Sequence, residues 1–363
     1  MSRVLRVGVI GAGVGVRTYL PAFAATGRAA VTAIAASSPR RAREVAAEHG
    51  IPFPCNDFVQ LCAMPELDLV CVASPNNLHL EHFRSALASG KHVLIEKPVA
   101  VDMDTFVEFI EPGQAEGQWV LVNHQLRFNP YLRALRDVIV SGALGNPYSI
   151  RIHQQDSGLF SSAAPFSWNT DPRGGGVRLA MGSHLVDLLG YLLGHQRFDA
   201  VSTTTTAVVP ARFDRDGRLR TAADVAFAAL VRANGTSALL SASSAAAGRT
   251  AFEVEVLADR GEARFDLDRK LSVACRGDPM TPCEPPGVTQ TERGNKQSIF
   301  RTSFVGFAQA LVEAILDGDG AALASACSLT EQGPTMAVLD AMHTSARTGH
   351  TVVPGPATVP DRI

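Results

Sequence analysis

The sequence predicts an α/β protein that begins with a doubly wound parallel sheet and continues into an α+β domain with a large open antiparallel sheet. Two observations carry this prediction. Apolar runs that suit buried parallel strands alternate with helical patterns in the first third of the chain, and alternating strand patterns dominate its second half. With 363 residues the chain is too long for one ordinary core, so we expect two domains, residues 1–122 and residues 123–363.

Composition excludes several classes of protein. The chain is 46% hydrophobic and 19% charged, which is typical of a globular protein. Its net charge of −2 provides no basic field for nucleic acid or an anionic membrane. The six cysteines show neither C-x-x-C nor zinc spacing, so we expect reduced thiols, no metal and a cytoplasmic location. We identify no leader and no apolar run of about 18 residues, so we expect no membrane span.

The first strand, Val7–Ile10, leads into a glycine-rich turn and then a helical pattern over residues 17–26. Gly11 permits the tight turn, Gly13 lets the backbone approach a pyrophosphate, and the helix N-terminus supplies N–H groups. This context predicts a dinucleotide site. Because Val16 occupies the third glycine position of G-x-G-x-x-G, the helix–strand packing is either wider or made by Gly15. We expect the cofactor to contact Gly11, Gly13, Val14, Gly15 and Val16.

The end of the second strand, Val31–Ala36, bears on the choice of cofactor. An NAD site would carry a carboxylate here for the ribose 2′-hydroxyl, but the residues that follow are hydroxyls and guanidiniums. They suit a 2′-phosphate, so NADP is favoured over NAD. The alternative is that Ser38 only caps the next helix and that the arginines are a solvated first turn. The candidate residues are Ser37, Ser38, Arg40 and Arg41.

Two further strands follow in the same pattern. The strand 67–73 runs into Ser74-Pro75-Asn76-Asn77, and a helix from about residue 78 to 89 is capped by Gly90. Val93-Leu94-Ile95 then runs directly into Glu96-Lys97-Pro98. A lysine at the carboxyl end of a parallel strand is a candidate for proton transfer or for stabilising an alkoxide. The alternative is a surface lysine after a buried strand.

Ser74-Pro75-x-x-Leu78-His79 and the run from Gly90 to Pro98 together resemble the signature of the Gfo/Idh/MocA oxidoreductases. The resemblance implies a Rossmann domain and a sugar dehydrogenase type of activity. It also implies that Lys97 touches both the substrate hydroxyl and the nicotinamide region. The expected cofactor contacts in this part of the chain are Ser74, Pro75, Asn76, His79, Glu96 and Lys97.

The segment after the predicted strand 119–122 also resembles this family, through its N-H-x-x-R-F element. Asn123 becomes a candidate cofactor contact and Arg127 a candidate substrate contact, although an interdomain ion pair explains Arg127 equally well. Further on, the irregular segment 157–171 contains Trp168. Sugars present apolar faces to aromatic rings, so Trp168 either forms the floor of a sugar site or plugs the core.

Residues 174–187 resemble the family's G-G-G-x-L-x-D-x-G-x-H-x-x-D segment. By this resemblance His184 is the acid/base at the reacting hydroxyl, and Asp187 one helical turn later is a substrate contact. Ala180 replaces the family aspartate, so either His184 works with Lys97 alone, or a carboxylate comes from elsewhere, or the site is altered. Arg178 replaces an apolar residue and indicates an acidic or phosphorylated substrate.

The remaining sequence matches a large sheet. Strand patterns cover residues 201–209, 224–232, 236–244, 251–258 and 262–267, with a hairpin turn at Asn234-Gly235. Small residues crowd 238–247, so we expect a flat face that packs against another sheet, and the family resemblance implies a homodimer or homotetramer. Helices are expected at residues 303–316 and 328–348.

Together these features predict an NAD(P)-dependent oxidoreductase acting on a CH–OH group of a sugar or cyclitol, with Lys97 and His184 at the reacting hydroxyl. Two alternatives remain open. One is a regulatory protein that binds NAD(P) and a ligand without turnover, and Ala180 is its main support. The other is an NAD-dependent glycosidase on the same scaffold.

Overall fold

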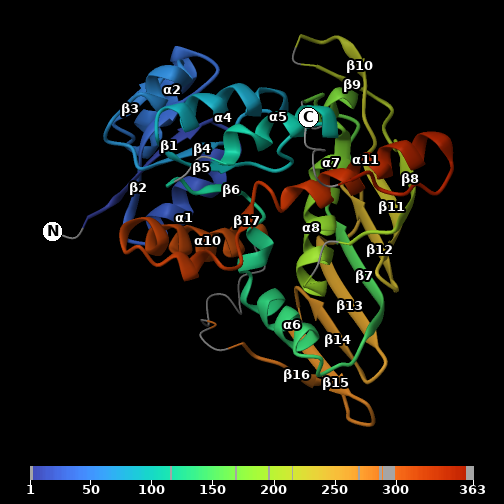
Figure 1. Ribbon diagram of the computed structural model, residues 1–363. Helices are drawn as coiled ribbons and strands as arrows, with labels where there is room; N and C mark the ends of the chain where they lie inside the picture. The colour runs from blue at the N-terminus through green and yellow to red at the C-terminus, as the bar shows by residue number, and fades with distance from the viewer. Residues whose placement is uncertain are drawn as a thin grey trace, which may run out of the picture. The chain divides into compact units, whose positions relative to one another are not determined.

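The structure of the chain is a computed structural model. It describes residues 3–114, 117–167, 170–194, 197–214, 216–268, 270–285, 288 and 299–356. The chain forms two compact units (Figure 1). The first contains residues 1–100, 104–129 and 300–332, and the second contains residues 101–103, 130–299 and 333–363.

Within the described ranges, the first unit holds a seven-stranded sheet with the strand order β17-β6-β5-β4-β1-β2-β3. Strand β17 pairs antiparallel with β6, and all other pairs are parallel. The order reverses between β1 and β4, and ligands bind at the carboxyl ends of the strands at such a point. The strands are β1 (Leu5–Ile10), β2 (Ala29–Ala35), β3 (Phe53–Cys55), β4 (Leu69–Val72), β5 (His92–Ile95), β6 (Val120–Val122) and β17 (Cys327–Ser328).

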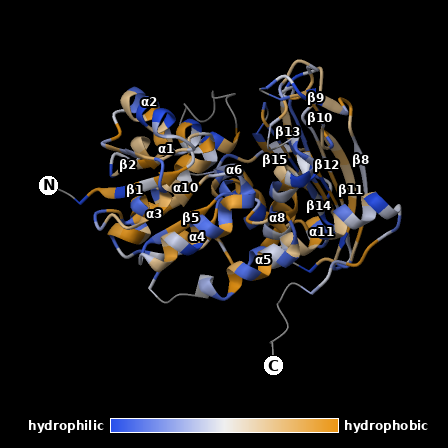
Figure 2. Ribbon diagram, turned by 90° about the horizontal axis from the view of Figure 1, so that it is seen from above, coloured by the Kyte–Doolittle hydropathy of each residue, from blue (hydrophilic) through white to orange (hydrophobic). Residues whose placement is uncertain are grey.

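Helical segments connect these strands, and hydrophobic and hydrophilic residues alternate along α2 and α4 in Figure 2. The sequence-based expectations match α4, expected from about residue 78 to 89, to within one residue. They missed β3 and α3, because β3 is three residues long, contains Pro54 and lies at the sheet edge, which leaves no periodic signal. The segments are η1 (Gly15–Tyr19), α1 (Leu20–Ala25), α2 (Pro39–His49), α3 (Phe58–Cys62), η2 (Asn76–Leu78), α4 (His79–Ala88), α5 (Met103–Ile110), η3 (Pro112–Gln114) and η4 (Gln125–Phe128).

The chain returns to the first unit through α10 (Ile299–Leu316), η7 (Gly320–Leu323) and β17. Buried residues of α10 such as Phe304 and Phe307 belong to the same core cluster as β1. By length and composition alone α10 could cross a membrane, but half of it is buried inside the protein, as in a core helix. The expected domain boundary after residue 122 stays a prediction, and the first compact unit also includes residues 123–129 and 300–332.

The second unit contains an eight-stranded sheet, counted over the described residues, in the order β16-β15-β14-β13-β7-β12-β11-β8. The expected sheet is present but not purely antiparallel, since β7 and β12 pair in parallel. Burial alternation reports which face a residue occupies and carries no information on strand direction. The strands are β7 (Pro147–Gln155), β8 (Ala200–Thr206), β11 (Ala226–Ala233), β12 (Thr236–Ser243), β13 (Ala251–Ala258), β14 (Gly261–Asp266), β15 (Lys270–Cys275) and β16 (Thr281–Pro282).

The predicted turn at Asn234-Gly235 joins β11 and β12 as a hairpin, with φ of 47° and 89° at the two residues. Only residues that tolerate a positive φ suit these positions, which confirms the prediction. A second, smaller hairpin of β9 (Ala211–Phe213) and β10 (Leu219–Thr221) was not expected. The helical segments of this unit are α6 (Pro130–Val140), η6 (Pro172–Gly174), α7 (Gly176–Ala180), α8 (Gly182–Leu193) and α11 (Gln332–Thr348).

Candidate functional site

The glycine turn after β1 leaves space for a ligand to approach its backbone. Gly11 has a φ of +120°, and a Cβ there would lie 2.2 Å from the carbonyl oxygen of Ala73. A Cβ on Gly13 would meet nothing within 4 Å. Gly11 is therefore required by the fold, whereas the fold alone does not require Gly13, and its exposed backbone fits a close approach by a diphosphate.

The helix after this turn begins with a wider π-helical turn, η1, in which the N–H of Leu20 donates to the carbonyl of Gly15. A Cβ on Gly15 would lie 2.5 Å from Cγ1 of Val9, so Gly15 makes the close helix–strand contact. Val16 instead packs against a small apolar cluster that includes Val45. The sequence left two interpretations open for the third glycine position. The structure supports the one in which Gly15 makes the close packing contact, and the wider π-helical turn accommodates this shift by one residue.

The end of β2 leads into α2, where Ser38 is the N-cap and its Oγ accepts from the N–H of Arg41 at 3.2 Å. The side chain of Arg40 is 86% exposed and lies 3.6 Å from Glu44, and Arg41 lies 3.8 Å from the same carboxylate. Ser37 is exposed. Ser38 therefore caps this helix, and the side chains of Arg40 and Arg41 are exposed at its start.

The segment after β4 is tied to the segment after Lys97 by His79, which is 1% exposed. Its Nε2 lies 2.9 Å from the carbonyl oxygen of Ser74 and its Nδ1 lies 3.1 Å from that of Val99. Burial lowers the pKa of His79 to about 4, so at neutral pH the ring has one proton and donates to one carbonyl at a time. Nearby, Nδ2 of the buried Asn76 has no hydrogen-bond partner among the described residues.

Lys97 follows the carboxyl end of β5 and is half-buried. Burial lowers the pKa of Lys97, and the neighbouring Glu96 partly offsets this effect. Oε1 of Glu96 accepts from the hydroxyl of Tyr19 at 2.6 Å and from Nδ2 of Asn123 at 2.7 Å. Sequence analysis missed Tyr19. The available signal is a tyrosine within an apolar helical pattern. Such a tyrosine is expected to be buried, and a buried hydroxyl needs a hydrogen-bond partner.

Two other predicted residues of the first unit are deeply buried. Asn123 is 0% exposed, and its Oδ1 has no hydrogen-bond partner among the residues described. Arg127 is 4% exposed, and its Nη1 lies 3.9 Å from a carboxylate oxygen of Glu331 and 3.5 Å from the carbonyl oxygen of Ala326. This ion pair lies inside the first unit, whereas the sequence suggested one between domains.

The candidate residues of the second unit lie on the consecutive helices α7 and α8. His184 and Asp187, 4% and 1% exposed, lie one turn apart in the first half of α8. Arg178 on α7 is also buried, and its Nη1 donates to the carbonyl of Leu339 on α11 at 2.8 Å. Burial lowers the pKa of Arg178 to about 10. The predicted substrate contact Trp168 lies outside the described residues.

The carboxyl edge of the first sheet fits a dinucleotide on three counts. Gly13 leaves its backbone open, and Asn76 and Asn123 each present a buried polar atom that lacks a partner in the described part of the chain. Most buried polar atoms in proteins have a hydrogen-bond partner in the protein, in ordered water or in a ligand. The first unit thus carries the glycine turn and Lys97 at the carboxyl edge of its sheet, and the second carries a buried imidazole one turn from a carboxylate on α8.

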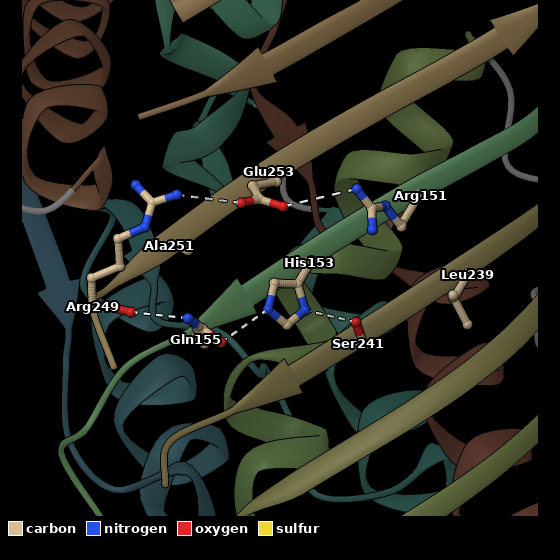
Figure 3. A pocket seen from close by; sticks show the side chains of 8 residues that line it. All are labelled: Arg151, His153, Gln155, Leu239, Ser241, Arg249, Ala251 and Glu253. Atoms are coloured by element: carbon tan, nitrogen blue, oxygen red, sulfur yellow. Dashed lines mark hydrogen bonds and ion pairs between the residues drawn. The ribbon is translucent and has the colours of Figure 1, made fainter. Parts of the chain in front are cut away.

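Figure 3 shows a hollow on the exposed face of the second unit's sheet. His153 occupies its middle, with Nδ1 2.8 Å from Oγ of Ser241 and Nε2 3.3 Å from Oε1 of Gln155. Arg151 and Arg249 each lie 3.9 Å from the carboxylate of Glu253. Because these charges pair with one another, the hollow is a weak candidate for a charged ligand.

Comparison with known proteins identifies both parts of the chain. Residues 5–124 match a family described as "Oxidoreductase family, NAD-binding Rossmann fold", and residues 132–264 match the "GFO/IDH/MocA C-terminal domain". An uncharacterized oxidoreductase of Synechocystis sp. is 29% identical over 71% of this chain and 70% of its own length. The 1,5-anhydro-D-fructose reductase of Ensifer adhaerens is 32% identical over 56% of this chain and 60% of its own length.

The fold also matches solved structures. Levoglucosan dehydrogenase in complex with NADH and levoglucosan has a TM-score of 0.85 and 23% identity, covering 98% of this chain and all of that chain. An NAD-binding oxidoreductase from Klebsiella pneumoniae has a TM-score of 0.83 and 22% identity, covering 97% of this chain and 99% of that chain. At this level of identity the likeness shows a common fold.

Proposed function

The chain belongs to the GFO/IDH/MocA family of NAD-binding oxidoreductases, and from that premise we propose that it transfers a hydride between a nicotinamide and a secondary alcohol or ketone of a sugar, cyclitol or sugar derivative. The names of an anhydrofructose reductase and a levoglucosan dehydrogenase among its relatives and structural neighbours support this class of substrate. The observation that carries the proposal is Lys97 at the carboxyl edge of the sheet that also holds the glycine turn.

In the proposed reaction the ammonium of Lys97 stabilises the substrate oxygen as negative charge develops on it. The imidazole of His184 takes or returns the hydroxyl proton. The nicotinamide, when bound, supplies the hydride chemistry. Arg127, Trp168 and Asp187 remain proposed substrate contacts, whereas the guanidinium of Arg178 is buried and donates to the carbonyl of Leu339.

Replacement of Lys97 tests this assignment. Lys97→Met should abolish turnover and leave the Kd for the cofactor within about twofold, because the methionine keeps the length of the side chain but not its charge. Lys97→Arg keeps a cation that cannot release its proton, so it separates charge stabilisation from proton transfer. A kcat unchanged in Lys97→Met would eliminate the proposed role. Loss of cofactor binding in the same variant would instead assign Lys97 to the cofactor alone.

NADP as the preferred cofactor is part of the proposal. Residues 35–41 contain no carboxylate, and Arg40 and Arg41 are exposed at the start of α2. A double Arg40→Ala, Arg41→Ala variant should weaken NADP binding by about tenfold or more and leave NAD binding nearly unchanged. Arg43→Ala, an exposed arginine on the same helix, is the matched control. Equal effects on both cofactors, or a wild-type preference for NAD, would reject this preference.

Ala180 at the position of the family aspartate favours a second candidate, a regulatory protein that binds NAD(P) and a ligand without turnover. Mass spectrometry of the supernatant of denatured protein would identify any retained cofactor, and a sugar screen would follow absorbance of the reduced nicotinamide. Cofactor binding without turnover of any sugar would favour regulation. Cleavage of an aryl glycoside without net reduced cofactor would identify an NAD-dependent glycosidase instead.

We also propose a homodimer or homotetramer in the cytoplasm, formed through the exposed face of the second unit's sheet. Leu230 and Leu239 are cross-strand neighbours on this face and are 50% and 43% exposed. A pair of apolar neighbours this exposed suits contact with another chain. Leu230→Asp with Leu239→Asp should therefore lower the mass measured by light scattering. Val59→Asp, at a 54% exposed apolar position on α3, should not.

A further inference from the structure

The carboxylate of Glu96 collects three donors from three separate segments of the first unit. The hydroxyl of Tyr19 on η1 and Nδ2 of Asn123 after β6 both donate to Oε1, at 2.6 Å and 2.7 Å. The backbone N–H of Lys97 lies 3.2 Å from Oε2. Glu96 is 7% exposed. All three groups are donors, and a carboxylate can accept a hydrogen bond from each of them.

The hydroxyl of Tyr19 is not needed for packing. Its ring stacks on Phe304 with centroids 4.6 Å apart and contacts Phe23 edge-on at 6.3 Å, and phenylalanine would make the same contacts. A buried hydroxyl costs free energy unless it is hydrogen-bonded. In this core, the distinctive contribution of tyrosine over phenylalanine is the hydrogen bond to Glu96.

We propose that Tyr19 is a positioning residue, whose hydroxyl fixes the Glu96 carboxylate against the backbone of Lys97 and thereby sets the orientation of the lysine side chain. The inference rests on the proposed role of Lys97. Tyr19 is the last residue of the π-helical turn that follows the glycine turn, so it connects the cofactor cradle to the lysine. Asn123 donates to the same oxygen of Glu96, and its Nδ2 also donates to the Tyr19 hydroxyl at 3.3 Å.

The charge of Glu96 also acts on the titration of its neighbours. Burial lowers the pKa of Lys97, and the charge of Glu96 opposes this effect. Burial raises the pKa values of Tyr19 and of Cys71 on β4, and the charge of Glu96 raises them further. Among the described residues with a shifted pKa, Lys97, Tyr19 and Cys71 are the groups whose shift includes the charge of Glu96. When Glu96 is held less firmly, Lys97 loses part of this support and releases its proton at lower pH.

The test compares Tyr19→Phe with Tyr131→Phe in the full-length protein. Tyr131 is the matched control, because it is also buried and its hydroxyl also donates to a glutamate, Glu284, at 3.2 Å. Tyr19→Phe should lower kcat by about tenfold or more with little change in the Kd for the cofactor, since small misplacements of a reacting group are costly. The alkaline limb of the kcat/KM profile should move to lower pH, and Glu96→Gln should move it further.

The results for these variants separate a positioning role of Tyr19 from a packing role. If Tyr19→Phe lowers Tm but keeps the wild-type kcat and alkaline limb, Tyr19 is only a core residue and the inference is overturned. If Tyr131→Phe moves the limb as much as Tyr19→Phe does, the inference is also overturned. If Lys97→Met keeps its turnover, the proposed function fails first. A dead Lys97→Met with an unaffected Tyr19→Phe rejects the positioning role alone.

Discussion

The rings of Tyr19 and Phe304 stack with their centroids 4.6 Å apart, although the two residues come from opposite ends of the chain. Tyr19 follows the first strand, and Phe304 lies on α10, which the chain reaches only after the large sheet of the second unit. Arg28 and Asp317 form a second tie between the same regions, with two hydrogen bonds of 2.7 Å and 2.8 Å. The nucleotide-binding unit is therefore completed by residues from the C-terminal part of the chain.

Truncation of Phe304 should destabilise the first unit. Phe304 is 0% exposed, so Phe304→Ala should lower the free energy of unfolding by about 3–5 kcal/mol, through lost burial and the cavity left behind. Val305→Ala, at a 37% exposed position on the same helix, should change it by about 0.5 kcal/mol or less. Urea denaturation measures both. Equal stability of the two variants would mean that α10 is not part of this core, and residues 1–122 would then stand as an independent domain.

The two glycines of the cofactor turn should respond differently to a methyl group. At Gly13 a Cβ meets nothing within 4 Å, so Gly13→Ala should keep its stability but bind the cofactor at least about tenfold more weakly. At Gly15 a Cβ would lie 2.5 Å from Cγ1 of Val9, so Gly15→Ala should lose about 1–3 kcal/mol of stability through overpacking. Thermal unfolding without cofactor, together with cofactor titration, separates the two effects. A stable Gly15→Ala would contradict the packing role of Gly15.

His79 should make the protein less stable in mild acid. Burial lowers its pKa to about 4, whereas an unfolded histidine titrates near 6.5. Between these values the unfolded chain binds more protons than the folded chain, so stability falls as the pH is lowered from 6.5 to 4, by about 3 kcal/mol for this group. His79→Gln removes this contribution. It should be less stable than the wild type at pH 7, and the difference should shrink toward pH 4. A difference that stays constant over urea titrations at pH 7, 6, 5 and 4 would assign the acid sensitivity to other groups.

The sequence was informative where chemistry depends on adjacent residues. Three features are each set by a few consecutive residues, and each was predicted at its place in the fold. They are the glycine turn after β1, the lysine after β5 and the Asn234-Gly235 hairpin. The hydrogen bond between Tyr19 and Glu96 could not be predicted, because the two residues are 77 positions apart and neither has a sequence pattern that points to the other. One pairing in the second sheet, the parallel one between β7 and β12, was missed for a similar reason, since side-chain alternation is the same in parallel and antiparallel pairs.

Arg178 shows most clearly how a local sequence pattern can miss a contact between distant residues. Its position within the family segment suggested an acidic substrate, but its guanidinium is buried and donates to the carbonyl of Leu339, 161 residues away. The pKa of about 10 leaves it charged at neutral pH, with the carboxylates of Asp224 and Asp340 near enough to support the charge. Arg178→Met removes the donor and leaves these groups without their cation. We expect the free energy of unfolding to fall by about 2–3 kcal/mol while KM stays unchanged.

Arg173→Met is the control for this prediction, because its side chain is 83% exposed in the same segment and its loss should change stability little. Urea denaturation and substrate titration on both variants give the two quantities that matter. A higher KM with unchanged stability in Arg178→Met would return Arg178 to the substrate site. A loss of stability at constant KM would mean that this arginine holds α7 to α11, and that an acidic substrate has no support from it.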